Sequence, residues 1–117
     1  MNTNERVFKM SFAGVYPHYV TKVEKKGRTT QELEDVLCWL TGYTAKGLAD
    51  QIARKTTLEA FFAEAPKLNK NVTKITGTIC GVRIENIEHT LMRNIRYMDK
   101  LVDELAKGRP LEKIKRT

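Results

Sequence analysis

Histidine and cysteine are scarce in this chain of 117 residues, which contains two of each. A metal site needs several converging His, Cys or carboxylate ligands, and neither His18 nor His89 has a partner three or four residues further on that would complete a usual motif. Cys38 and Cys80 are isolated in apolar surroundings and form no CxxC pair, so we expect buried, reduced thiols. The sequence therefore predicts no metal, no disulfide and no cofactor.

Long apolar runs are also missing. No stretch approaches the roughly 20 apolar residues that a membrane-spanning helix needs. The first residues, MNTNERVFKMSFAG, lack the charged start and apolar core of a secretory signal peptide. We therefore expect a cytoplasmic protein without a membrane partner. The length suits one hydrophobic core and not two, which predicts a single domain over residues 1–117.

Catalytic motifs are absent as well. The run GTICGV lacks the lysine and the following Ser or Thr of a Walker phosphate loop. The neighbouring acids Asp103 and Glu104 point about 100° apart on a helix, so they are unsuited to general acid–base catalysis. Cys80 and His89 could meet across a turn, but their spacing does not predict a catalytic pair. The sequence thus leaves open whether the protein is an enzyme.

The chain is organised around the stretch from Ile84 to Lys107. Its apolar residues recur at spacings of four and three, which predicts one buried stripe along a helix made of Leu91, Ile95, Met98, Val102 and Leu105. Asp103 and Lys107 have the favourable spacing for an ion pair, and Gly108 provides a helix stop. Met92, Tyr97 and Leu101 widen the apolar arc beyond the stripe. We expect part of this arc to be covered by a second copy, in a homodimer.

Shorter helices are predicted before this stretch. Residues 1–10 are expected to form an extended arm or simply to pack on the domain. The next helix is predicted to begin near Tyr16, so that Pro17 falls in the first turn, where a missing N–H is tolerated. Capping-box spacings at Thr29 with Glu32, and at Thr56 with Glu59, predict two further helix starts, and Thr44 begins a helix between them.

Residues 73–84 show a different pattern. Isoleucine, valine and threonine alternate there with Gly77 and Gly81, which favours a β-hairpin or a pair of short extended segments after a polar loop at 67–72. The fold class predicted is mainly α, a compact bundle of about five helices with a short β-hairpin or extended element near 73–84.

Positive charge is unevenly distributed, and the net charge is +7. Residues 65–83 contain four basic residues and no acid, and the first 28 and last 13 residues are also basic. Basic segments attract nucleic acid, so weak, non-specific nucleic-acid binding is one expectation. Residues 30–55 also read as helix, glycine-containing turn and helix, which is compatible with a helix–turn–helix. The negative balance of that segment and its mixed second helix count against DNA binding.

Aromatic residues provide the remaining indication of a site. Tyrosine and tryptophan combine apolar area with a polar group, which suits ligand pockets, partner surfaces and cores alike. An arginine among β-branched residues needs an anionic partner if it faces inward. The candidate ligand- or partner-binding residues are Tyr16, His18, Trp39, Tyr43 and Arg83.

Several phrases resemble a family of small bacterial proteins, the domain of unknown function 2200. They are MSFAGVYPHYVTKVEKKGRT, CWLTGY, FFAEAP, ICGVRIE and LMRNIRYMDKLVDELAKG, and the resemblance extends from about Arg6 to Arg116. It implies a cytosolic, mainly helical domain and assigns no activity or functional residue. Our leading hypothesis is a cytosolic non-enzymatic binding or interaction protein. The alternatives are a nucleic-acid-binding module that uses the basic segments, and a small enzyme or ligand-binding protein with an aromatic pocket.

Overall fold

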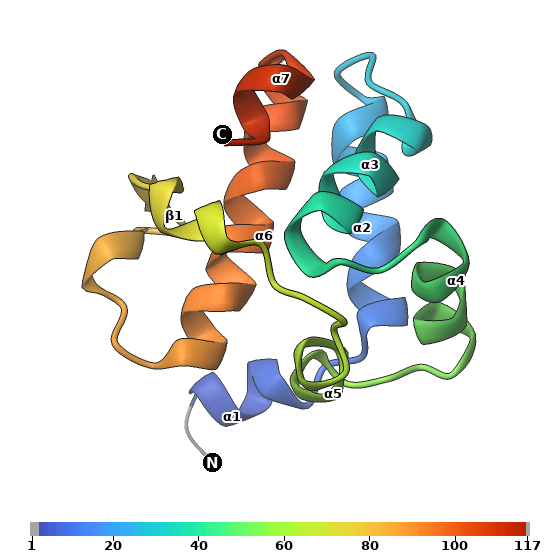
Figure 1. Ribbon diagram of the computed structural model, residues 1–117, viewed down its shortest axis with the longest axis vertical. Coiled ribbons are helices and arrows are strands. Elements are labelled where there is room, and N and C mark those ends of the chain that lie inside the picture. The colour runs from blue at the N-terminus through green and yellow to red at the C-terminus, as the bar shows by residue number, and fades with distance from the viewer. Residues whose placement is uncertain (1–2, 117) are drawn as a thin grey trace.

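The structure, a computed structural model, describes residues 3–116. Its helices and strands, in chain order, are α1 (Thr3–Phe8), α2 (Phe12–Glu24), α3 (Thr30–Thr41), α4 (Ala45–Ala53), α5 (Leu58–Ala63), η1 (Lys70–Lys74, a 3₁₀ helix), β1 (Thr78–Ile79), β2 (Val82–Arg83), η2 (Ile84–Asn86, also 3₁₀), α6 (Thr90–Ala106) and α7 (Leu111–Ile114). Figure 1 shows α6 beside α2 and α3, with α1 and α5 at one end of α6 and α7 at the other. The mainly α fold with a short hairpin is confirmed.

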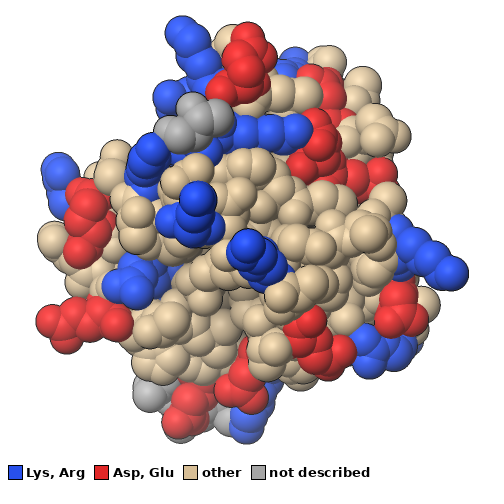
Figure 2. Space-filling view, viewed as in Figure 1, with Lys and Arg blue, Asp and Glu red and all other residues tan. Residues whose placement is uncertain are grey.

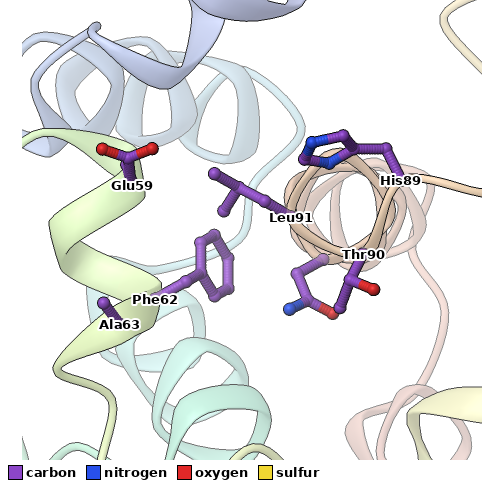
Figure 3. Close-up of a pocket in the computed structure, with 7 residues that line it drawn as sticks. Glu59, Phe62, Ala63, His89, Thr90 and Leu91 are labelled. Carbon is purple, nitrogen blue, oxygen red and sulfur yellow. The ribbon is translucent and has the colours of Figure 1, made fainter.

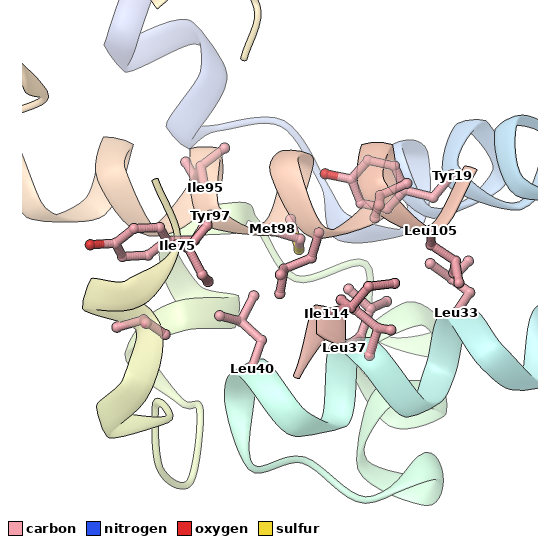
Figure 4. Packing of buried hydrophobic residues seen from close by; sticks show 14 of the residues in the cluster. Tyr19, Leu33, Leu37, Leu40, Ile75, Ile95, Tyr97, Met98, Leu105 and Ile114 are labelled. Atoms are coloured by element: carbon pink, nitrogen blue, oxygen red, sulfur yellow. The ribbon is translucent and has the colours of Figure 1, made fainter. Parts of the chain in front are cut away.

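Helix α6 provides the largest share of the core. Four residues of the predicted stripe are buried, namely Ile95, Met98, Val102 and Leu105. Leu91, at its start, is only partly buried. Figure 4 shows Met98 and Leu105 facing α3, with Ile114 of α7 in the space between the two helices. Each such side chain contributes about 1.5–3 kcal/mol when it is fully buried.

The wider apolar arc of α6 is covered within one chain. Met92, Tyr97 and Leu101 are each at most 7% exposed. Among residues 3–116, the large hydrophobic side chains that stay exposed are Met10 and Val82, on other elements. Because the arc is covered within one chain, it no longer gives a reason to expect a homodimer through α6. The homodimer stays a prediction that light scattering can decide.

The predicted starts of α6 and α2 were wrong. Helix α6 begins at Thr90 and not at Ile84, because residues 84–86 form the separate turn η2 and His89 caps α6, its Nδ1 accepting the Met92 N–H at 3.4 Å. Helix α2 begins at Phe12 and not near Tyr16. The Ser11 side chain accepts the Gly14 N–H at 3.0 Å, and this N-cap starts the helix early enough to place Pro17 inside it.

The N-terminal segment also differs from the extended arm that we offered as one possibility. Residues 3–8 form the helix α1, which contacts both α5 and α6. Phe8 packs its ring 4.9 Å from that of His89. The segment is therefore part of the domain's packing, which was the other possibility.

Threonines cap three of the helices. Thr29 and Glu32 form the predicted capping box, and Thr44 caps α4 as expected. The cap of α5 is Thr57 and not Thr56, its hydroxyl accepting the Ala60 N–H at 3.1 Å. Thr56 instead donates its hydroxyl to the Gln51 side chain at 2.6 Å, a partner that the capping-box spacing could not reveal.

The predicted hairpin is present and very short. Strands β1 and β2 are antiparallel, with Ile79 paired to Val82. Cys80 at the turn is exposed and has a φ of 52°, and Cys38 is only partly buried. The expectation of two buried thiols was therefore wrong, because the hairpin carries Cys80 away from the core. The segment 67–72, which was predicted to be a loop, is partly helical, since the 3₁₀ helix η1 begins at Lys70.

The C-terminal tail is held against the domain by ion pairs. Glu104 is 6% exposed, and both of its carboxylate oxygens accept hydrogen bonds from Arg116, at 2.6 and 2.8 Å. Arg109 adds a third bond to the same carboxylate at 3.2 Å, and Lys115 pairs with Asp35 of α3. The basic tail is thus largely neutralised by acids of the same chain.

Candidate functional site

The five predicted site residues do not line one cavity. Tyr43 is buried and donates its hydroxyl to the Phe61 carbonyl at 2.6 Å, and burial, with a smaller contribution from Glu64, raises its pKa to about 12. Tyr16 is partly buried on α2, where burial and then Glu34 raise its pKa. Both tyrosines serve packing in this structure.

The other two polar candidates also lie apart. His18 is exposed on α2 and lines a small hollow of about 210 Å³ that also contains Tyr19 and Asp99. Tyr19 donates its hydroxyl to Asp99 at 2.6 Å, and burial together with that carboxylate raises the tyrosine pKa well above its usual value. Arg83 points outward on β2 and pairs with Glu85 at 3.4 Å, so it is a surface arginine.

Trp39 is the candidate that lines a substantial hollow. This hollow has a volume of about 490 Å³ and lies between the C-terminal end of α3 and the segment that follows α5. We call it the Trp39 cleft, and it is lined by Trp39, Gly42, Lys67, Asn69, Lys70 and Asn71. In Figure 1 the segment between α5 and β1 crosses the middle of the view beside the end of α3.

Backbone hydrogen bonds fix the two walls of the Trp39 cleft against each other. The carbonyls of the last turn of α3 lack partners within the helix, and the segment after α5 supplies them. The Lys67 N–H donates to Thr41 at 3.1 Å, and the Asn69 N–H donates to Leu40 at 2.9 Å. The cleft is therefore built on rigid backbone.

Gly42 permits this close approach. It ends α3 with a φ of 80°, and a Cβ placed there would lie 2.8 Å from both N and O of Lys67. Gly27 has nearly the same φ, 81°, but a Cβ there would meet nothing within 4 Å. Both glycines thus need a positive φ, but only at Gly42 would a side chain also collide with neighbouring backbone.

Replacing Gly42 by alanine should therefore destabilise the protein more than replacing Gly27. Gly27→Ala should lower the free energy of unfolding by about 1 kcal/mol, the cost of a left-handed non-glycine residue. Gly42→Ala adds a clash with backbone and should cost at least about 1 kcal/mol more. Urea unfolding of both variants measures the difference, and equal costs would show that the contact at Lys67 does not constrain the cleft.

The lysines of the Trp39 cleft are exposed. Within the described part of the chain, neither the Lys67 nor the Lys70 side chain forms a hydrogen bond or an ion pair, in contrast to Arg109, Lys115 and Arg116 of the tail. Figure 2 shows lysine and arginine side chains at the centre and upper left of this face, with many of the carboxylates near its rim. Two unneutralised charges at one cleft favour an anionic ligand.

The asparagines add neutral hydrogen-bonding groups. Asn69 accepts the Asn71 N–H through Oδ1 at 2.8 Å, and Asn71 donates through Nδ2 to the Arg116 carbonyl at 3.1 Å. Over residues 3–116 these bonds leave Nδ2 of Asn69 and Oδ1 of Asn71 without a partner. The cleft therefore offers an amide donor and an amide acceptor as well as two cations.

A second hollow, of about 440 Å³, lies between α5 and the start of α6. Figure 3 shows Phe62 and Leu91 pointing toward each other across it, with Glu59 and His89 above them. Its floor is apolar and its rim carries a carboxylate. Nothing in the structure indicates what would cover it, so the Trp39 cleft is the better defined candidate.

The helix–turn–helix interpretation loses support from the charges of α4. Arg54, at its C-terminal end, is hydrogen-bonded to Asp50 and to Glu64, each at 2.9 Å. Arg54 is thus neutralised and is not a free cation for a DNA phosphate. No group of three or more His, Cys, Asp or Glu residues that could hold a metal occurs within residues 3–116.

Sequence reasoning identified Trp39 but missed its neighbours in the cleft. Lys67 and Lys70 were noted only as part of a basic connection, and Asn69 and Asn71 were not singled out. The sequence feature that could have indicated an anion site is that residues 65–83 contain lysines and no acid. What the sequence lacked was the contact that brings residue 67 to the end of α3.

Comparison with known proteins agrees with this fold and assigns no activity. The chain is similar to the crystal structure of uncharacterized protein SP1917, with 41% sequence identity over 97% of this chain and 92% of that one, and a TM-score of 0.89. No protein with a curated description matches the chain. No helix among residues 3–116 is both long and apolar enough to cross a membrane. Residues 6–116 match the family described as "Uncharacterized protein conserved in bacteria (DUF2200)", and the chain belongs to that family.

Proposed function

We propose that this chain is a non-enzymatic, cytoplasmic binding protein that takes a phosphate-bearing ligand in the Trp39 cleft. The observation that carries the proposal is the pair of unneutralised lysines, Lys67 and Lys70, beside an aromatic wall. Ammonium groups that have no protein partner can bind a phosphate without first breaking an ion pair. The exposed, free thiol of Cys80 is compatible with a reducing compartment such as the cytosol.

The rigid construction of the cleft supports binding. Its two walls are joined by the backbone bonds at Leu40 and Thr41, so little backbone conformational entropy is lost when a ligand enters. The free Nδ2 donor of Asn69 can orient an anion that the lysines attract.

The test uses inorganic tripolyphosphate as the probe, with isothermal titration calorimetry and the emission of Trp39 as readouts. Trp39 is the single tryptophan of the chain, so the emission reports on the cleft directly. We expect saturable binding that the double variant Lys67→Gln/Lys70→Gln weakens at least about tenfold, because charge-assisted bonds contribute about 1.5–3 kcal/mol each.

The matched control is Lys25→Gln/Lys26→Gln. It removes the same charge just after α2, near the start of α3 and thus at the opposite end of that helix from the cleft. The control should bind as the unmodified protein does. Equal weakening in both double variants would show that only net charge matters, and would contradict a site at the Trp39 cleft.

A further inference from the structure

We propose that the ligand of the Trp39 cleft is single-stranded nucleic acid, with one base stacked on the Trp39 indole and neighbouring phosphates on Lys67 and Lys70. This inference rests on the proposed function and adds the class of ligand. It needs three properties of the surface: a platform for a base, cations that continue beyond the cleft, and no element suited to a duplex groove.

The platform is the indole in the wall of the cleft. Single-stranded binding proteins combine aromatic side chains, on which bases stack, with basic grooves that follow the backbone. The cleft volume of about 490 Å³ lies in the usual range for small-ligand sites, about 300–1,000 Å³, so one base fits. The free Nδ2 of Asn69 and Oδ1 of Asn71 can meet polar atoms of that base or of its sugar.

The cations continue from the cleft toward α7. The bond from Asn71 to the Arg116 carbonyl joins the floor of the cleft to the C-terminal tail. Lys113, on the short helix α7 within that tail, is exposed, and within residues 3–116 its side chain has no partner. Lys113 is therefore a third unpaired cation on the segment that contacts the cleft lining, and it is available to a ligand with several phosphates.

A duplex suits this surface poorly. Reading a duplex groove usually requires an inserted helix or a two-stranded ribbon. The hairpin has two residues in each strand, and Arg54 of α4 is neutralised by Asp50 and Glu64. A concave site with a central aromatic residue instead suits a base that is not paired.

The test measures fluorescence anisotropy of a fluorescein-labelled oligothymidylate with the intact chain. Trp39→Leu should weaken binding about 5- to 150-fold, as expected from a stacking contribution of about 1–3 kcal/mol per base, and Trp39→Phe should retain most of the affinity. Thermal unfolding of both variants verifies that they are folded. In Lys67→Gln/Lys70→Gln, the slope of log K against log salt should become shallower by about 1.4, since each neutralised phosphate contributes about 0.7 on single strands.

Two further probes separate this inference from the proposed function. A duplex of the same length and thymidine triphosphate should each bind more weakly than the single strand. If tripolyphosphate binds in a manner that depends on Lys67 and Lys70 while Trp39→Leu leaves oligonucleotide affinity unchanged, the nucleic-acid inference is overturned and the anion site stands. If thymidine triphosphate binds as tightly as the oligonucleotide, the site is one for a mononucleotide. If no anion binds at the cleft, both proposals fail.

Discussion

Replacing Glu104 by glutamine is expected to lower the free energy of unfolding by about 3 kcal/mol, near the lower end of the cost of breaking a buried ion pair. The Glu104 carboxylate is bonded by Arg116, whose side chain is 12% exposed, and by Arg109. Glutamine keeps the size of the side chain and removes the charge, so the Arg116 guanidinium is left without an anionic partner. The lower end applies because the Arg116 guanidinium keeps its hydrogen bond to the Ile114 carbonyl at 2.7 Å.

Glu112 provides the matched control for this substitution. It is exposed on α7, four residues before Arg116, and Glu112→Gln should change stability by less than about 0.5 kcal/mol. The double replacement Glu104→Met/Arg116→Met should recover much of the loss, because a buried pair can be exchanged for apolar residues of similar volume. Chemical denaturation that shows Glu104→Gln to be as harmless as Glu112→Gln would contradict a structural role for the pair.

The second large effect is expected at Phe61. Phe61→Ala should cost about 3–5 kcal/mol, through lost burial and the cavity that remains. The Phe61 ring is fully buried, is stacked 4.1 Å from Phe12, and lies 5.0 Å from the ring of Tyr43. It anchors α5, a helix of only six residues that has little stability of its own.

Phe62 is the natural comparison, since it occupies the next position on the same helix. Its ring is only partly buried and lines the hollow between α5 and α6. Phe62→Ala should therefore cost clearly less than Phe61→Ala in thermal or denaturant unfolding. The reverse order would show that α5 is held chiefly through its other face.

Local rules predicted a large part of the fold. The stripe on α6 followed from residue spacing, because a helix brings residues three and four apart onto one face. The capping box at Thr29 and the helix stop at Gly108 were equally readable, since each depends on a few neighbouring residues. Such features depend on contacts within one helical turn, so they can be predicted from neighbouring residues in the sequence.

Contacts between distant residues could not be predicted in the same way. The spacing of Asp103 and Lys107 indicated their ion pair, but nothing local indicated that Glu104 would bind Arg116, twelve residues later. Pro17 suggested a late start for α2, and the cap at Ser11 overrode that preference. In each case a tertiary or capping interaction outweighed a local tendency.

The Trp39 cleft illustrates the same limit at the candidate site. Its aromatic wall comes from α3 and its lysines from a segment almost thirty residues later in the sequence. The sequence showed both an aromatic group and a basic connection, and only the fold brings Trp39 to Lys67 and Lys70. The other four candidates are of residue types that are common in binding sites, but they do not line the cleft. They are Tyr16, His18, Tyr43 and Arg83.

The most direct test of the Trp39 cleft as the binding site is chemical-shift mapping by NMR during a titration with oligothymidylate. The account predicts that the one indole N–H signal, from Trp39, and the backbone amides of Gly42 and of residues 67–71 shift together and saturate at the same concentration. Shifts confined to residues 59–63 and 89–94, around the hollow between α5 and α6, would place binding elsewhere and contradict the account. An unchanged spectrum at saturating oligonucleotide would contradict nucleic-acid binding itself.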